Sequence, residues 1–75
     1  MNKKQMVEYL WYKFAKYKET AGQHEFIKLF ALDNKLFPLY HDLQVNYSDE
    51  HADIFIRVMT RVLKELGADI PELIK

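Results

Sequence analysis

Apolar residues recur every three or four positions along most of this chain, the spacing that places them on one face of an α-helix. This pattern predicts a first helix over residues 3–20. Its apolar stripe consists of Met6, Val7, Leu10, Trp11, Phe14 and Tyr17. Gly22 is predicted to end the helix, because glycine readily adopts the left-handed conformation that follows many helix C-termini. Thr20 and Gln23 have the spacing of a capping box that would open the next helix, so the connection is expected to be very short.

The middle of the chain predicts two shorter helices. The first runs from about residue 23 to residue 32, where Asp33 and Asn34 interrupt the pattern. Pro38 disfavours helical geometry at the residue before it and suits the first turn of a new helix, which predicts a short helix over residues 38–44. The inward side chains are predicted to be Phe26, Ile27, Leu29 and Phe30 in the first, and Leu39 and Leu43 in the second.

A long helix is predicted from Asp49 to Leu66. Ser48 can accept hydrogen bonds from free backbone N–H groups, and acidic residues in the first turn suit the positive end of the helix dipole. Gly67 is expected to end it. The inner stripe is predicted to be Ala52, Phe55, Ile56, Val58, Met59, Val62, Leu63 and Leu66. Asp69 and Glu72 repeat the capping pattern, which predicts a short C-terminal helical turn that brings Ile70, Leu73 and Ile74 to the core.

The expected fold is all-α, a small bundle of four main helices plus that C-terminal turn. A chain of 75 residues makes one domain, residues 1–75, and its 49% hydrophobic content with two glycines and two prolines is typical of a folded protein. The absence of cysteine excludes disulfides and thiolate metal sites. No stretch approaches the roughly 20 apolar residues that a membrane span needs, so we expect a cytoplasmic protein without a membrane partner.

The polar residues form no recognisable catalytic or metal-binding motif. Each histidine has an acidic neighbour, and such pairs can support metal binding or acid–base catalysis. His51 and Asp53, however, are two residues apart and point to different sides of a helix, and no HExxH motif occurs. We therefore expect surface histidines, no cofactor and no enzyme, with a pH-sensitive contact or a metal site as the alternatives.

Tyr9 and Tyr12 lie off the apolar stripe of the first helix, on the side that also carries Lys13 and Lys16. Tyrosine is enriched in protein interfaces, where its ring packs while its hydroxyl stays hydrated. This side is a candidate partner-binding face. In the alternative, neighbouring helices cover the rings or the rings pack on lysine stems. Single-stranded nucleic acid would also suit tyrosines and lysines, but few cations gather here.

The predicted helix over residues 49–66 carries a second candidate face, made of Ile54, Arg57 and Arg61. Ile54 falls outside the apolar arc. Together the two long helices offer more apolar surface than a short monomer readily hides, which favours a homodimer. We therefore predict a non-enzymatic protein-binding module, a small stand-alone regulator or an inhibitor or immunity-type factor, whose partner is another protein.

The alternative function is a small DNA-associated regulator that uses Arg57, Arg61 and Lys64. These residues form one basic row on the predicted long helix. A formal net charge of zero argues against duplex binding, which depends on neutralising phosphates. The acidic first turn of the same helix would also face the phosphates in a helix-turn-helix arrangement. Nucleic acid is therefore the less favoured partner.

Overall fold

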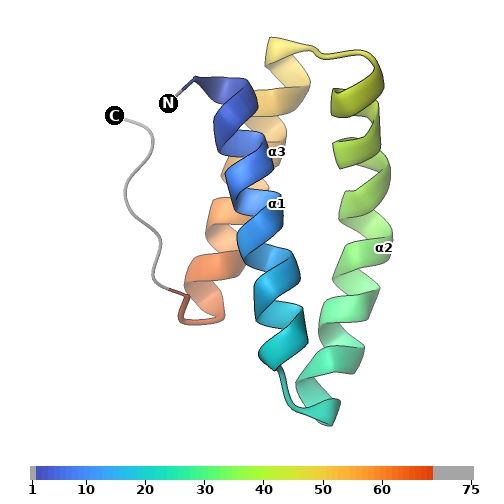
Figure 1. Cartoon of the computed structure of the whole chain (residues 1–75), viewed down its shortest axis with the longest axis vertical. Coiled ribbons are helices and arrows are strands. Elements are labelled where there is room, and N and C mark those ends of the chain that lie inside the picture. Colours follow the sequence, from blue (N-terminus) through green and yellow to red (C-terminus); the bar gives the residue numbers. More distant parts are fainter. Residues whose placement is uncertain (1, 69–75) are drawn as a thin grey trace.

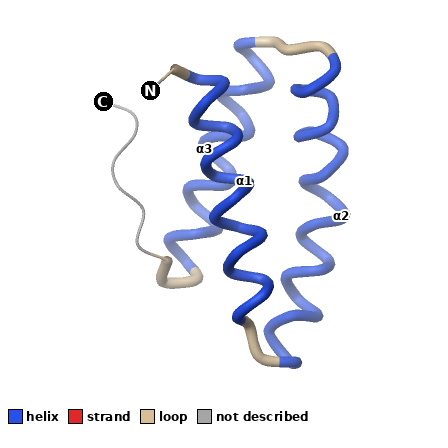
Figure 2. Tube along the Cα trace, viewed as in Figure 1, coloured by secondary structure: helices blue, strands red, loops and turns tan. Residues whose placement is uncertain are grey.

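The protein is a bundle of three helices in the computed structural model, which describes residues 2–68. The helices are α1 (Lys3–Thr20), α2 (Gln23–Val45) and α3 (Asp49–Glu65), and they run alternately in opposite directions (Figure 1). Only short loops join them, and the described part contains no strand (Figure 2). The all-α prediction is confirmed, whereas the prediction of four main helices is wrong. The predicted C-terminal turn with Asp69 and Glu72 lies outside the described residues.

The two short helices predicted in the middle of the chain are one helix, α2. Pro38 lies inside it, although an interior proline removes a backbone donor and commonly costs about 3 kcal/mol. The helix continues because its buried stripe continues past the proline, with Leu29, Leu36 and Leu43 at seven-residue intervals. Asp33, the predicted break, is held by an ion pair of 3.0 Å with Lys18 of α1. Tertiary packing thus overrides the local signals for a break.

The connection between α1 and α2 is as short as predicted, but its details differ. Gly22 has φ −68° and ψ 163°, an extended conformation, and it precedes the first turn of α2. It therefore does not end α1 in the left-handed conformation. Thr20 lies inside α1, where its hydroxyl donates to the Tyr17 carbonyl oxygen at 3.1 Å. The predicted capping box of Thr20 and Gln23 is consequently wrong.

The ends of α3 agree with the sequence pattern. The Ser48 hydroxyl accepts a long hydrogen bond of 3.5 Å from the His51 backbone N–H. At the other end Gly67 is left-handed, with φ 80°. The Gly67 N–H donates to the Lys64 carbonyl at 3.0 Å and the Ala68 N–H donates to the Leu63 carbonyl at 2.9 Å. This pair of bonds is a Schellman motif, which satisfies carbonyl groups that the end of the helix leaves free.

The core takes one face from each helix, and α1 and α3 pack on each other more extensively than α2 packs on either. Two polar contacts also join α1 to α3. The Tyr17 hydroxyl donates to the Leu66 carbonyl at 2.9 Å, and the Lys3 ammonium lies 3.0 Å from the Asp53 carboxylate. The buried side chains are Val7, Leu10, Phe14, Leu29, Leu36, Leu43, Ala52, Phe55, Ile56, Met59 and Leu63.

The predicted inner stripes are confirmed for α1 and for most of α3. In α2, Leu43 is buried and Leu39 packs against the core as predicted, but the set predicted between residues 26 and 30 is mostly exposed. Of its four side chains predicted to face inward between residues 26 and 30, only Leu29 is buried. Phe26, Ile27 and Phe30 are 44%, 66% and 52% exposed. Val58 of α3, also predicted to face inward, is 37% exposed. A helix with apolar residues on two sides does not reveal in its sequence which side the other helices will cover.

Candidate protein-binding surface

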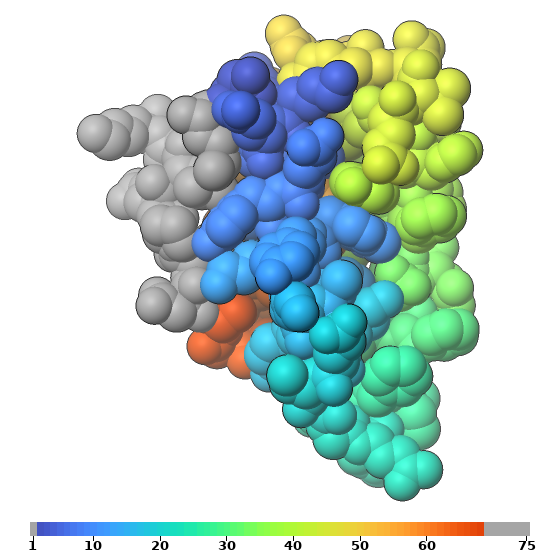
Figure 3. Space-filling model, in the orientation of Figure 1, coloured from blue at the N-terminus to red at the C-terminus, as the bar shows by residue number. Residues whose placement is uncertain are grey.

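A line of exposed apolar side chains runs along the solvent side of α2. Phe30 and Phe37 are each about half exposed, and Ile27 is 66% exposed. The helix forms one long side of the molecule and is drawn in teal to yellow-green in Figure 3. None of the described residues covers this line. It is therefore an apolar surface without a partner in the described part of the chain.

The exposed line has the spacing of a coiled-coil seam. Its positions alternate in steps of four and three residues, and all of them are exposed. We call this set the α2 stripe; it comprises Gln23, Ile27, Phe30, Asn34, Phe37, His41 and Gln44. An average repeat of about 3.5 residues keeps one seam facing a neighbouring helix. Two apolar sides therefore occur on α2, and the bundle uses only the other one.

Contacts between aromatic rings hold the side chains of the α2 stripe in place. Phe26 and Phe30 have ring centroids 6.3 Å apart, and Phe37 and His41 have centroids 6.0 Å apart, with nearly parallel planes in both pairs. Phe37 also packs on Trp11 of α1, with centroids 5.9 Å apart. Because these contacts hold the rings in place, less side-chain freedom is lost when a partner binds.

On α1 the structure brings the four predicted binding residues together in two pairs. The Lys13 ammonium lies 5.8 Å from the centroid of the Tyr9 ring, and the Lys16 ammonium lies 5.7 Å from that of Tyr12. Tyr12 is 58% exposed and Tyr9 is half-buried. These contacts agree with the alternative that the rings pack on lysine side chains. The face is mostly polar, with one largely exposed ring.

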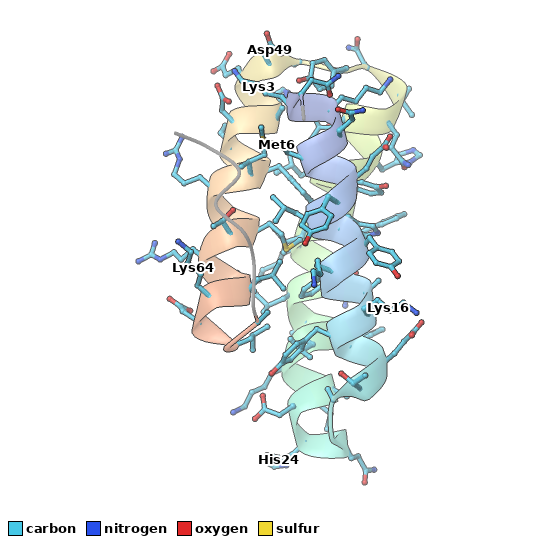
Figure 4. The ribbon with its side chains drawn as sticks, turned by 60° about the vertical axis from the view of Figure 1, so that its left-hand side comes forward. Lys3, Met6, Lys16, His24, Asp49 and Lys64 are labelled. Atoms are coloured by element: carbon cyan, nitrogen blue, oxygen red, sulfur yellow. The ribbon has the colours of Figure 1, made fainter. Side chains whose placement is uncertain are left out.

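On α3 the second predicted face is exposed as well. Ile54 is 40% exposed, and Arg57 and Arg61 are both exposed. Arg61 lies 3.7 Å from Glu65, and both side chains are more than 70% exposed, so this pair contributes little to stability. Lys64, which follows Arg61 by nearly one turn, and Lys16 of α1 point to opposite sides of the bundle (Figure 4). The two predicted faces are therefore separate surfaces.

A small pocket of about 180 Å³ lies between the start of α1 and the end of α2. The Tyr40 hydroxyl accepts a hydrogen bond from the Gln44 amide at 3.2 Å. Burial, followed by the nearby Glu8 carboxylate, raises the pKa of Tyr40. The pocket is smaller than the roughly 300–1,000 Å³ of typical ligand sites. It is lined by Lys4, Val7, Glu8, Tyr40, Leu43, Gln44 and Tyr47.

Within residues 2–68, no group of three histidine or carboxylate side chains is placed to hold a metal ion. The same residues include no helix with both the length and the apolar character needed to cross a bilayer.

Residues 2–68 form an all-α arrangement of three helices, and the longest exposed apolar line on this part of the chain is the α2 stripe. Comparisons with protein-family models, curated proteins and solved structures give no significant match. The α2 stripe does not follow from the helices predicted from sequence, because the first of the two predicted in this region ends at residue 32. The alternating steps of four and three residues that continue past Pro38 are the signal that reveals it.

Proposed function

We propose that this protein is a non-catalytic binding module, a small cytoplasmic regulator or inhibitor that acts by binding another protein chain. The observation that supports this function best is the α2 stripe. Aromatic residues are enriched in protein interfaces, and a continuous apolar patch on a small soluble protein commonly marks an interaction site. The stripe places Ile27, Phe30 and Phe37 on one exposed side of α2.

The size of the stripe supports a helical partner. Phe30 and Phe37 of the stripe are 52% and 49% exposed, and Phe26, which lies beside the stripe and stacks on Phe30, is 44% exposed. At roughly 200 Å² per phenylalanine side chain, they present roughly 300 Å² of apolar surface. This surface is long and narrow, because it follows one side of a helix. A second helix with apolar residues at three- and four-residue intervals fits such a strip.

The two faces predicted from sequence remain weaker proposals. The α3 face with Ile54, Arg57 and Arg61 is exposed, and the α1 face is only partly so, since Tyr12 and Lys16 are exposed while Tyr9 and Lys13 are half-buried. Each face has few large exposed apolar side chains. No contact favours the alternative DNA-associated function. Acidic side chains accompany the basic row of α3, since Asp53 and Glu65 lie on the same side of the helix.

The proposal is tested by placing negative charge in the α2 stripe. We expect the double variant Phe30→Glu, Phe37→Glu to lose the protein partners that the tagged wild-type chain captures from cells, because burying two carboxylates is unfavourable. The control, Lys28→Gln with Lys35→Gln, changes the net charge by the same amount outside the stripe and should retain them.

Circular dichroism must show unchanged helicity in both double variants for this comparison. The variant Tyr9→Ala, Tyr12→Ala tests the α1 face in the same assay. Unchanged capture by the Phe30→Glu, Phe37→Glu variant would contradict the proposal that the α2 stripe is the binding surface.

A further inference from the structure

We infer that the α2 stripe binds the α2 stripe of a second copy of this chain, with the two helices antiparallel. This inference rests on the proposed function, since it names the protein that covers the stripe. Three features of α2 support it: the order of its aromatic residues, the polar residue at its centre and the area it exposes.

Two stacked ring pairs of α2 have the same spacing in both directions along the helix, although Tyr40, which stacks on Trp11, has Ile27 and not an aromatic residue as its counterpart. The stacked pairs Phe26–Phe30 and Phe37–His41 are each spaced by four residues, and seven residues separate Phe30 from Phe37. A two-fold axis between residues 33 and 34 would therefore place Phe30 against the partner's Phe37, and Phe26 against the partner's His41. A two-fold interface between identical chains requires this symmetry: if Phe30 of one chain contacts the partner's Phe37, then Phe37 of the first chain contacts the partner's Phe30.

The ends and the centre of the stripe follow the same symmetry. The axis that pairs the aromatic residues also places Gln23 against the partner's Gln44. Asn34, exposed in the single chain, would lie beside the axis. A single asparagine in an apolar seam fixes the register of two helices, because its amide needs a hydrogen-bonding partner there. An antiparallel pair also opposes the two helix dipoles, which favours it over a parallel pair.

The exposed apolar side chains along α2 supply a large part of the area that a dimer interface buries. α2 has 23 residues and is therefore about 34 Å long. The three phenylalanines provide roughly 300 Å², and Ile27, Val45 and the polar members of the stripe bring the surface available along the helix towards the roughly 800 Å² that each chain buries in a standard interface. Val45, at the end of the helix, is 73% exposed.

The absence of cysteine allows the geometry to be tested with single cysteines and a short thiol-specific cross-linker. Asn34→Cys should give a covalent dimer in high yield, because the two thiols lie near the axis. Gln23→Cys and Gln44→Cys should each fail to cross-link alone and should cross-link when mixed. Lys35→Cys, outside the stripe, is the control for random collisions and should remain monomeric.

Cross-linking of Gln23→Cys with itself would overturn the antiparallel arrangement. Equal yields for Asn34→Cys and the control would overturn the interface itself.

Sedimentation separates this inference from the proposed function. The chain has a mass of 9.0 kDa, so the dimer has twice that mass. We expect the wild type and the Lys28→Gln, Lys35→Gln control to sediment as dimers at tens of micromolar, and Phe30→Glu, Phe37→Glu to sediment as a helical monomer. A wild-type monomer at high micromolar concentration would overturn the inference. The proposed function would still stand in that case if the same variant loses a different captured protein.

Discussion

At the scale of single residues, Lys18 and Asp33 form the most enclosed ion pair among the described residues. The Lys18 ammonium lies 3.0 Å from Oδ1 of Asp33, and the two side chains are only 18% and 21% exposed. The ammonium also lies 5.9 Å from the ring centroid of Trp11 and 5.3 Å from that of Phe14. Although Oδ1 makes no well-directed hydrogen bond, the short distance shows a direct ionic contact between α1 and α2.

Removing one partner of this pair should destabilise the fold. We expect Asp33→Ala to lower the free energy of unfolding by about 1–3 kcal/mol, because it leaves the half-buried Lys18 ammonium unpaired. The control is Glu19→Ala, which removes the exposed contact of 3.7 Å with Lys16 and should cost less than about 0.5 kcal/mol. Urea unfolding followed by circular dichroism measures both. Equal losses would contradict the importance of burial for this pair.

Tyr40 should make stability depend on pH in the alkaline range. Its pKa is raised above the ordinary 10.0, so the folded state holds the hydroxyl proton more tightly than the unfolded state does. The resulting stability is present below pH 10 and is lost as pH rises through the folded-state pKa. Tyr40→Phe retains a ring to stack on Trp11, 4.6 Å away in the wild type, but removes this proton.

We therefore expect the free energy of unfolding to fall less steeply as pH rises above about 10 in Tyr40→Phe than in the wild type. The pKa of Lys3 is also raised, chiefly by its hydrogen bond to Asp53, so both proteins weaken in this range. The difference between their slopes isolates Tyr40. Denaturant midpoints measured across the range test this, and parallel curves would show that the hydroxyl contributes nothing.

At the scale of helices, the sequence predicts α1 and α3 well because each has one apolar stripe and clear ends. Asp49, at the predicted start of α3, is its first residue, and Gly67 ends the helix in the left-handed conformation. α2 could not be predicted in the same way. Asp33 and Pro38 are local signals for a break, and they are outweighed by a contact with α1 and by leucines that the bundle buries. Such contacts exist only once the helices have packed.

Two neighbouring residues of α2 test which of its sides belongs to the core. Leu29 is fully buried and Ile27 is 66% exposed. We expect Leu29→Ala to lower the free energy of unfolding by about 2–5 kcal/mol, because it leaves a cavity. Ile27→Ala should cost less than about 0.5 kcal/mol in a chain kept monomeric by Phe30→Glu with Phe37→Glu. Urea unfolding of both in that background provides the comparison. Similar losses would contradict the assignment of the two sides.

At the scale of the whole molecule, the candidate surfaces could be predicted only in part. Tyr12 and Ile54 are predicted as candidate surface positions because each lies outside the apolar arc of its helix, and both are exposed. Phe30 and Phe37 were not identified as a surface. Their exposure depends on the position of α2 beside α1 and α3, where two other helices cover only one of its two apolar sides. No pattern within one helix contains that information.

The same arrangement predicts how stability is distributed. α2 packs less extensively than α1 and α3 pack on each other. In the monomeric Phe30→Glu, Phe37→Glu variant, the backbone amides of α2 should therefore exchange faster than those of α1 and α3, because opening α2 costs less free energy. In the concentrated wild type the second copy should slow exchange in α2 selectively. Native-state hydrogen exchange followed by NMR measures both. Two results would contradict this expectation. One is that α2 exchanges as slowly as α3 in the variant, and the other is that exchange in α2 of the wild type does not change with protein concentration.

The close packing of α1 against α3 also has a consequence for biosynthesis. The two helices that pack most extensively on each other are separated by the whole of α2, so Leu10 and Phe14 leave the ribosome before Phe55 and Met59 do. During that interval the nascent hairpin of α1 and α2 exposes the apolar side chains that α3 covers in the complete bundle. We therefore expect newly made chains to be open to chaperones and proteases until α3 has emerged, and a chain that lacks α3 to be degraded.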